Sequence, residues 1–581
     1  MFKQTLLFSI SFLVILSLLA QNADRKKLRI YGLEGVTIEH NSFISDSLLA
    51  LSEKNIILQQ LYELSYLAAS FDSLKVTLEE IELYFTKGEE YKWLHLKAGN
   101  LPPNIISRVD IQNRIFYNQT FNKHQLTELY KRAIQHFENN GYPFASIGMD
   151  SIEINERQAI SAVLTLDKGP FYQFDSIEVV GDIGVSERYI LNSLSLKLGK
   201  PYVESKFKNI TSRIQEIPFL EEEKIHEVQF FEKSVKLILY LKKKKASRFD
   251  GIVGLMTNEA DGSISVTGDV NLQLINAFNR GEQLSLSWEK MRENSQELTI
   301  DFKLPYLFSS PFGLDYQFDL YKEDTTFLDL KNKIGVNYIF SGEESIIFFV
   351  ANRQSSLLSK NQYLNSATTQ LPPFADISTT QFGIRYLLQR LDYSYNPQRG
   401  FRLQPTFAVG QKKAKKILAL EEQYPNIYSG FKENSNQYDG EVLLNLYIPI
   451  GKRSTIMLAN QSASTYADVL FTNELFRIGG LKTLRGFDER SIRASTYSIF
   501  TLEYRFLLDR NSYLSVFSDG GFYEAKHKDG YVKDIPYGIG AGINFETGVG
   551  IFSFNYAVGK QFDNPIEIRS AKIHFGYTSI F

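Results

Sequence analysis

The sequence predicts α+β modules followed by an all-β transmembrane barrel of about 16 antiparallel strands. Three observations support this prediction: alternating apolar and polar segments in the C-terminal half, 44 Phe and 33 Tyr residues, and a change of pattern near Arg248. Side chains of a barrel strand point in turn to the lipid and to the lumen. A two-residue period is therefore the expected signature of each strand.

The final segment, Ala571–Phe581, alternates without a break, with Ile573, Phe575 and Tyr577 on one face and polar or small residues between them. The same alternation recurs in four upstream segments, Gln283–Lys290, Thr299–Leu304, Phe312–Tyr321 and Ile499–Phe506. A soluble amphipathic strand, taken alone, has the same pattern. The number of such strands, their charged faces and their aromatic partners favour a barrel with an apolar outside and a wet interior.

The barrel is predicted to occupy residues 249–581. With about 20 residues for each strand and its connection, this stretch provides roughly 16 strands. An even number returns both barrel ends to the same side, and short turns are typical of the periplasmic side, so the N-terminal modules are expected in the periplasm. Beyond the N-terminus no apolar run reaches the ~18 residues that a membrane helix needs, which excludes a helical membrane protein.

Residues 1–20 have the character of a signal peptide, because Lys3 precedes an apolar run that ends on the small residue Ala20. This pattern predicts export of the mature chain. A membrane anchor is the competing interpretation, although the run is short for a spanning helix.

The stretch between the signal peptide and the barrel mixes helical and strand patterns and is long enough for three small modules. The predicted modules are residues 24–96, 97–170 and 171–248, and the first of them matches the common order of strands and helices least well. Expected helices are Leu48–Leu67, Leu126–Asn140, Glu187–Leu194 and Glu204–Ile217, and expected strands include Lys75–Tyr84, Ala159–Leu166, Phe174–Val180 and Ser234–Leu241.

Composition excludes several kinds of chemistry. The chain has no Cys, so neither disulfides nor thiolate metal sites can form, and 64 basic against 66 acidic residues leave no basic footprint for nucleic acid. The seven His residues show no metal-ligand spacing. The glycine-rich segment Gly538–Gly542 could be a dinucleotide loop, but it lies in a strand pattern without a following helix. We therefore expect no catalytic residues, no metal and no cofactor.

A loop motif and five further segments carry a family resemblance. Phe476–Ile492 (FRIGGLKTLRGFDERSI) resembles the sixth extracellular loop of the outer-membrane insertase and translocase superfamily that includes BamA, TamA and the two-partner secretion transporters. Arg485, Gly486 and Phe487 match the arginine, glycine and aromatic core of that loop. The other matches are Asp392–Leu403, the strand with Glu503, the segments Val516–Tyr523 and Ile535–Phe545, and the final strand ending in Phe581. The N-terminal units are similar to the polypeptide-transport-associated (POTRA) domains of this family, with GYPFA at Gly141–Ala145.

The resemblance implies that Arg485 lies on a loop folded into the lumen. A buried arginine needs carboxylate partners, and Glu503 on a polar strand face is one candidate. Asp519 is the other, and the resemblance implies the same pairing. Two interpretations stay open: the loop is a functional lock, or Arg485 only keeps a long loop ordered.

The last strand holds the second mechanistic candidate. Gly576 interrupts a bulky strand, which permits a kink or weakened pairing, or else allows packing against a bulky lumen group. The resemblance implies a seam between the first strand, about Phe249–Leu255, and the last, Ala571–Phe581. An unpaired strand edge there is a template for a strand of another chain.

The expected function is that of a TamA-like outer-membrane protein insertion and assembly factor. Exported polypeptides, unfolded outer-membrane or secreted chains, would enter through the periplasmic modules and leave through the seam into the lipid bilayer. A periplasm-spanning or lipoprotein partner on the first module is left open, and no nucleic acid is expected. The alternatives are a two-partner secretion pore that exports one large partner, and a passive porin.

Overall fold

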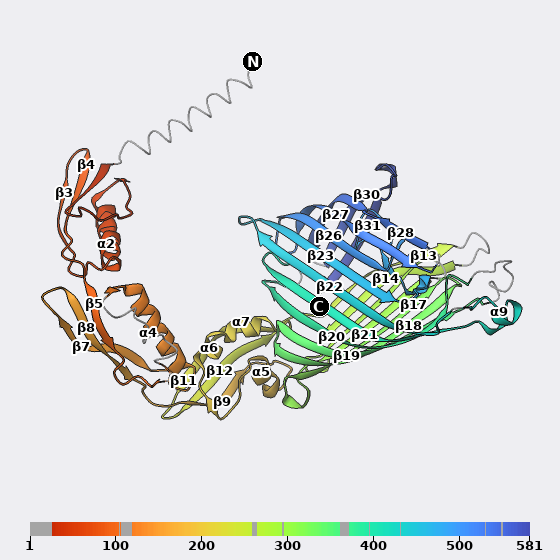
Figure 1. Ribbon diagram of the computed structural model, residues 1–581, viewed down its shortest axis with the longest axis horizontal. Coiled ribbons are helices and arrows are strands. Elements are labelled where there is room, and N and C mark those ends of the chain that lie inside the picture. The colour runs from red at the N-terminus through yellow and green to blue at the C-terminus, as the bar shows by residue number, and fades with distance from the viewer. Residues whose placement is uncertain are drawn as a thin grey trace, which may run out of the picture. The chain divides into compact units, whose positions relative to one another are not determined.

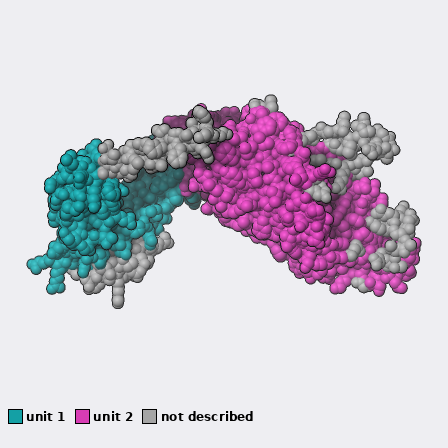
Figure 2. Space-filling model, turned by 90° about the horizontal axis from the view of Figure 1, so that it is seen from above, with its two compact units in different colours: residues 1–176, 198–208, 230–236 teal, residues 177–197, 209–229, 237–581 magenta. Residues whose placement is uncertain are grey.

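The computed structural model describes residues 26–103, 105, 119–257, 264–292, 295–360, 371–393, 396–429, 431–528, 530–547, 550–566 and 568–580. The predicted signal peptide lies outside these residues. The chain divides into two compact units, one of residues 1–176, 198–208 and 230–236 and the other of residues 177–197, 209–229 and 237–581 (Figure 2). In the part of the chain that is described, no helix is both long and apolar enough to cross a membrane.

The first small sheet has the strand order β2-β1-β4-β3, with β1 and β4 parallel. Its one described helix, α2, begins after Asp46, whose side chain accepts a hydrogen bond from the Leu49 N–H at 2.8 Å. Ile57 and Leu61 of this helix are fully buried against the sheet. The elements are β1 (Lys26–Tyr31), β2 (Phe43–Ile44), α2 (Ser47–Glu63), β3 (Ser70–Val76) and β4 (Glu80–Thr86). The expected strand Lys75–Tyr84 is wrong, because a turn at Thr77 splits this segment between β3 and β4.

The second small sheet repeats this plan in the order β6-β5-β8-β7, again with a parallel central pair, β5 and β8. Asn122 caps α4, and Trp93 is fully buried in the core of this sheet. The elements are β5 (Lys92–Lys97), β6 (Gln119–Thr120), α4 (Lys123–Glu138), β7 (Ser146–Ile154) and β8 (Ala159–Asp167). The predicted boundary after residue 96 therefore falls inside β5, whose pairing with β8 joins it to the second sheet.

The third small sheet has the order β10-β9-β12-β11, and its residues are shared between the two compact units. Its elements are β9 (Gln173–Val180), α5 (Glu187–Ser193), β10 (Lys200–Pro201), α6 (Glu204–Lys208), α7 (Ile210–Gln215), β11 (Leu220–Phe230) and β12 (Ser234–Lys243). The single helix expected over Glu204–Ile217 is two short helices, because Asn209 leaves the helical backbone between them.

The rest of the second unit is a closed antiparallel barrel (Figure 1). Because β28 and β29 pair with successive parts of β27, they form one interrupted strand of the wall, and the barrel has 16 strands as predicted. The strands are β13 (Arg248–Thr257), β14 (Ile264–Ile275), β15 (Gln283–Arg292), β16 (Ser295–Leu304), β17 (Phe312–Glu323), β18 (Phe327–Ser341), β19 (Glu344–Leu357), β20 (Asp376–Leu391), β21 (Gly400–Lys415), β22 (Asn434–Pro449), β23 (Ser454–Ala467), β26 (Thr496–Leu507), β27 (Tyr513–His527), β28 (Gly530–Asp534), β29 (Tyr537–Thr547), β30 (Gly550–Lys560) and β31 (Lys572–Ile580). Short helices lie in the connections: η2 (Leu307–Ser309), α9 (Leu418–Gln423) and η4 (Ile568–Ser570).

The alternation along β26 separates the lipid-facing side of the wall from the lumen, as the sequence predicted. Phe500 and Leu502 are 61% and 52% exposed on the outside, whereas Glu503 and Arg505 on the inside are 4% and 9% exposed. An apolar exterior and a polar, charged interior are what a barrel in a lipid bilayer requires.

The pairing that closes the barrel, between the first strand β13 and the last strand β31, has fewer paired positions than the pairings next to it. The first and last strands pair at three positions, Arg248 with Ile580, Phe249 with Ser579 and Asp250 with Thr578. By contrast, β13 pairs with β14 at ten positions and β30 pairs with β31 at seven. Most of the edges of β13 and β31 therefore take no part in the seam ladder within the described strands.

Candidate functional site

The candidate site is built around the connection between β23 and β26, residues 468–495, called loop 6 below. Loop 6 contains the short helix η3 (Thr472–Glu474) and a hairpin of β24 (Phe476–Ile478) and β25 (Ile492–Ala494). Its apolar side chains form one buried cluster with the inner wall of the barrel, made of Ala463, Ile478, Leu484, Phe487, Ile492, Ala494, Tyr497, Ile499 and Tyr523. The loop is thereby packed into the lumen rather than extended away from the barrel.

Arg485, at the tip of loop 6, binds two carboxylates of the inner wall. Its Nε donates to Asp519 Oδ2 at 2.7 Å and its Nη2 donates to Asp519 Oδ1 at 2.8 Å, which is a bidentate pair. Its Nη1 donates to Glu503 Oε2 at 2.6 Å. The Arg485 backbone N–H also donates to Asp519 Oδ2 at 3.1 Å, so this one carboxylate holds both the side chain and the backbone of the tip.

The two carboxylates are themselves held in place. Glu503 Oε1 accepts a hydrogen bond from Arg505 Nε at 2.7 Å, so Glu503 lies between two arginines. Asp519 Oδ1 accepts from Thr501 Oγ1 at 2.8 Å. The Arg485 guanidinium also lies 3.4 Å from the centre of the Phe517 ring, a cation–π contact. If one of these charged side chains moved away, its former partner would stay buried without an opposite charge. The cluster is therefore expected to hold or release as a unit.

Glycines allow the tip to touch the wall. A Cβ on Gly538 would lie 1.9 Å from the Arg485 carbonyl oxygen, and a Cβ on Gly559 would lie 2.7 Å from that of Gly486. Gly486 itself has φ +95°, a backbone conformation that other residues rarely adopt. The glycine-rich segment that begins at Gly538 is thus part of strand β29 and serves the close approach of loop 6.

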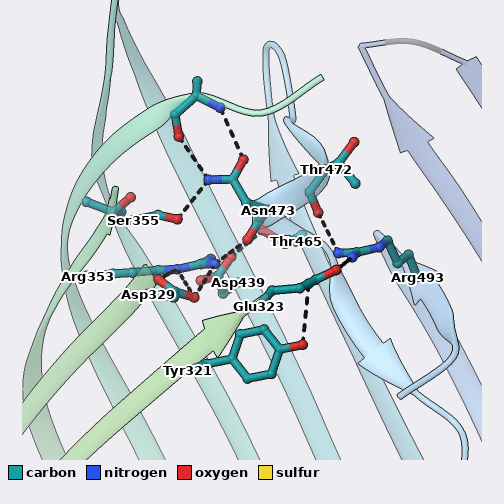
Figure 3. Close-up of polar contacts among 12 residues, drawn as sticks. Tyr321, Glu323, Asp329, Arg353, Ser355, Asp439, Thr465, Thr472, Asn473 and Arg493 are labelled. Carbon is teal, nitrogen blue, oxygen red and sulfur yellow. Dashed lines mark hydrogen bonds and ion pairs between the residues drawn. The ribbon is translucent and has the colours of Figure 1, made fainter. Parts of the chain in front are cut away.

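Further cations of loop 6 bind the opposite wall. Arg490 pairs with Glu289 at 2.8 Å and with Glu297, and Arg493 pairs with Glu323. Arg477 stacks on the Tyr321 ring at 3.5 Å. The loop is consequently fixed to β15, β16 and β17 as well as to β26 and β27. Figure 3 shows the Arg493 and Glu323 contact beside the base of the loop.

Two polar cavities flank loop 6, and no residue lines both. One, of about 370 Å³, is lined by Arg485, Glu503, Arg505 and other polar residues. The other, of about 280 Å³, is lined by charged residues of the wall and of loop 6 that include Asp319 and Arg477. Since each cavity is bounded by both wall and loop, loop 6 lies across the lumen between them.

At the seam, Gly576 is not required by packing. Among the described residues, a Cβ there would meet only the Cβ of Ser553, at 3.7 Å, which is an ordinary contact. No bulky side chain that the structure describes packs against Gly576. Phe581, the other seam residue singled out from the sequence, lies outside the described residues.

The structure thus brings Arg485, Gly486, Phe487, Glu503 and Asp519 together and leaves Gly576 apart from them. Sequence reasoning missed Arg505, Phe517 and Gly559, which complete the cluster. A signal for Arg505 was present, because it follows Glu503 by two residues and so lies on the same strand face. For Phe517 and Gly559 there was none, because their roles depend on where the loop lies in the lumen.

Comparisons with known proteins agree with this architecture. A family model described as the Omp85 superfamily domain matches residues 276–581. No curated protein matches the chain in sequence. Among solved structures, CdiB from Acinetobacter baumannii has 12% identity and a TM-score of 0.54, with 92% of this chain and 98% of that chain covered. CdiB from Escherichia coli has 12% identity and a TM-score of 0.54, with coverage of 94% and 100%. BamA from Haemophilus ducreyi lacking POTRA domains 1–3 has 14% identity and a TM-score of 0.43, with coverage of 85% and 100%.

Proposed function

Because the chain belongs to the Omp85 superfamily of outer-membrane barrels, we propose that it inserts other barrel proteins into the outer membrane, in the manner of a TamA-like assembly factor. Its clients in this proposal are unfolded outer-membrane polypeptides that have been exported to the periplasm. The reaction is strand addition and transfer into lipid, without a catalytic residue or a cofactor. The small modules before the barrel lie in the periplasm and receive the clients.

The seam is the observation that carries the proposal. A client chain needs an open strand edge next to lipid, and among the described residues β13 and β31 pair at three positions. Backbone N–H and C=O groups beyond these three pairs offer hydrogen bonds to an incoming strand. Breaking a ladder this short requires less free energy than breaking the ten-position ladder between β13 and β14. Insertion therefore proceeds at the edge of β13, and the client leaves sideways into the bilayer.

The Arg485 cluster acts in this proposal as a lock that holds loop 6 against β26, β27 and β29 while the seam opens. A barrel that loses three ladder pairs needs another support for its last strands. Bonds from Arg485 to Glu503 and Asp519, together with the close approach at Gly538, provide that support. Asp488 of loop 6 also binds Lys572, the first residue of β31, at 2.7 Å.

A two-partner secretion pore is the second candidate. CdiB, as its structures are named, shares the fold over more than nine-tenths of this chain. Three small sheets precede the barrel in this chain. In the family that the sequence resembles, two-partner secretion pores usually carry two such modules, so the three sheets favour the insertase. A passive porin is disfavoured, because ion pairs hold loop 6 across the lumen.

Depletion of the protein followed by quantitative proteomics of isolated outer membranes and culture medium tests the proposal. Loss of several unrelated barrel proteins from the membrane is the expected result. Loss of one secreted protein from the medium, with barrel proteins unchanged, would instead identify a secretion pore.

A further inference from the structure

Loop 6 has a second attachment point, at its base, that shares no residue with the Arg485 cluster. Glu474 of η3 pairs with Lys412 of β21, with Glu474 Oε2 and Lys412 Nζ 2.6 Å apart. The Lys412 and Glu474 side chains are 3% and 1% exposed, which makes this an almost completely buried ion pair. The same Glu474 oxygen accepts a hydrogen bond from the Phe471 N–H at 2.8 Å.

The neighbouring residue, Asn473, binds strand β19 and the residue that precedes β20. Its Nδ2 donates to Ser355 Oγ at 2.8 Å and to the Ala375 carbonyl at 2.9 Å. Its own carbonyl accepts from Arg353 Nη2 at 2.6 Å, and Arg353 is held in turn by a bidentate pair with Asp329 (Figure 3). The base is therefore fixed to β18, β19 and β21, whereas the tip is fixed to β26 and β27.

The ion pair at the base has its charges the opposite way round from the ion pairs of Arg485 at the tip. At the tip, loop 6 supplies the cation and the wall supplies the carboxylates. At the base, the loop supplies the carboxylate of Glu474, and the wall supplies Lys412 and Arg353. Glu474 is thus a loop carboxylate bound by cations of the wall, beside the loop cation Arg493, which binds the wall carboxylate Glu323.

The base also covers the end of the barrel where the long connections lie. Phe471 is 2% exposed and packs with Ala375, Ile377 and Ala414, and the Thr472 N–H donates to the Pro373 carbonyl at 2.9 Å. Residues 371–375, which precede β20, are thereby joined to the first part of loop 6. These contacts surround the buried ion pair and exclude water from it.

We propose that Lys412 and Glu474 form a seal that keeps the lumen closed to solutes at the barrel rim next to the start of β20 and the end of β21, independently of the Arg485 tip. Removal of one member leaves the other charge buried without a partner, so the base leaves the wall. Removal of both charges with the side-chain volume retained lets the contact stay closed, since an apolar pair of similar size often replaces a buried ion pair without loss. The Glu474 Oε1 atom is buried without a hydrogen-bond donor, which makes the ion pair no better than an apolar contact at this place.

Ion conductance of the purified full chain in planar bilayers tests the seal. Three variants are compared: Glu474→Leu, Lys412→Met, and the Lys412→Met and Glu474→Leu double variant. The two single variants are expected to raise the fraction of time spent open on the order of a hundredfold, as an uncompensated buried charge implies. The double variant is expected to return close to the parent.

Lys416→Met is the matched control. Lys416, in the connection that follows β21, pairs with Glu421 at 2.7 Å. These side chains are 26% and 34% exposed, so loss of the pair is expected to leave conductance unchanged. Heat-modifiable migration in electrophoresis shows that each variant retains a folded barrel. Parental conductance in both folded single variants would overturn the proposal, and so would a double variant as open as the single ones.

Discussion

Replacement of Asp519 by Ala is expected to release the tip of loop 6. Asp519 accepts three hydrogen bonds from Arg485, two of them from the guanidinium at 2.7 and 2.8 Å. Removal of one partner of a buried ion pair costs about 3 to 5 kcal/mol. Because Glu503 still binds Arg485 in the variant, we expect the lower end, about 3 kcal/mol, which raises the population of released loop about a hundredfold.

Thiol labelling measures this release directly, because the chain contains no Cys. Ala494 of β25 is fully buried in the loop 6 cluster, and Ala494→Cys is a small change that creates a protected reporter. When opening and closing are fast, the labelling rate follows the open population. Asp519→Ala is therefore expected to speed labelling about a hundredfold, at the ratio of tenfold for each ~1.4 kcal/mol.

Asp468→Asn is the control within the same loop. Asp468 pairs with Lys432 at 3.3 Å, and the two side chains are 51% and 71% exposed, so this pair contributes little. Its variant is expected to label at the parental rate. Labelling of the Asp519→Ala variant at the parental rate would refute the role of Arg485 in holding the loop.

A charge exchange refines the same prediction. Arg485→Glu with Asp519→Arg restores the principal pair but places the new carboxylate against Glu503, where Arg485 Nη1 now donates at 2.6 Å. Two carboxylates at this distance repel each other. The exchange is expected to restore slow labelling only when Glu503→Gln is added.

Two further perturbations test other parts of the account. Gly538→Ala is expected to speed the labelling of the Ala494→Cys reporter, because the new Cβ would lie 1.9 Å from the Arg485 carbonyl oxygen. Gly576→Ala is expected to leave labelling and folding unchanged, because the new Cβ would make an ordinary contact with Ser553 at 3.7 Å. The pKa of Glu216, at the end of α7, is raised from 4.5 to about 7, mainly by burial, with a lowering contribution from Arg213 and a raising one from the nearby Glu343. A carboxyl group with a raised pKa binds its proton more tightly in the folded state, so its contribution is complete below pH 4.5 and is lost as the pH rises to about 7. Proteolysis near α7 is therefore expected to be faster at pH 8 than at pH 5.5, and Glu216→Gln to remove that difference; equal pH dependence in the variant would contradict this.

The barrel could be predicted from the sequence because its signal is local. Side chains of a strand alternate whatever the strand pairs with, so Leu502 and Glu503 already indicate which face meets lipid. Glu503 could be proposed as a partner of Arg485 for the same reason, since it lies on a polar strand face, whereas the pairing with Asp519 was implied by the family resemblance. Both carboxylates contact Arg485 in the structure.

Features that depend on distant contacts could not be predicted. Lys412 and Glu474 are separated by 62 residues, and nothing in either segment indicates their pairing. The boundary between the first two small modules was placed too late, because β5 is assigned by its parallel pairing with β8 and not by its own pattern. The short seam could not be predicted either, because the alternation of β31 continues along the whole strand. The register with β13, in which three pairs join the described parts of the two strands, is seen in the structure alone.

A disulfide across the seam tests the central claim most directly. Phe249→Cys with Ser579→Cys joins residues that face each other between β13 and β31, and Leu272→Cys with Leu286→Cys makes the matched control between β14 and β15 in the same row of the barrel. Each pair is expressed in cells depleted of the parent protein, and newly made outer-membrane barrel proteins are quantified under oxidising conditions and after reduction. An opening seam predicts that oxidation stops their insertion only in the seam variant and that reduction restores it. Normal insertion with the seam disulfide fully formed would contradict the account.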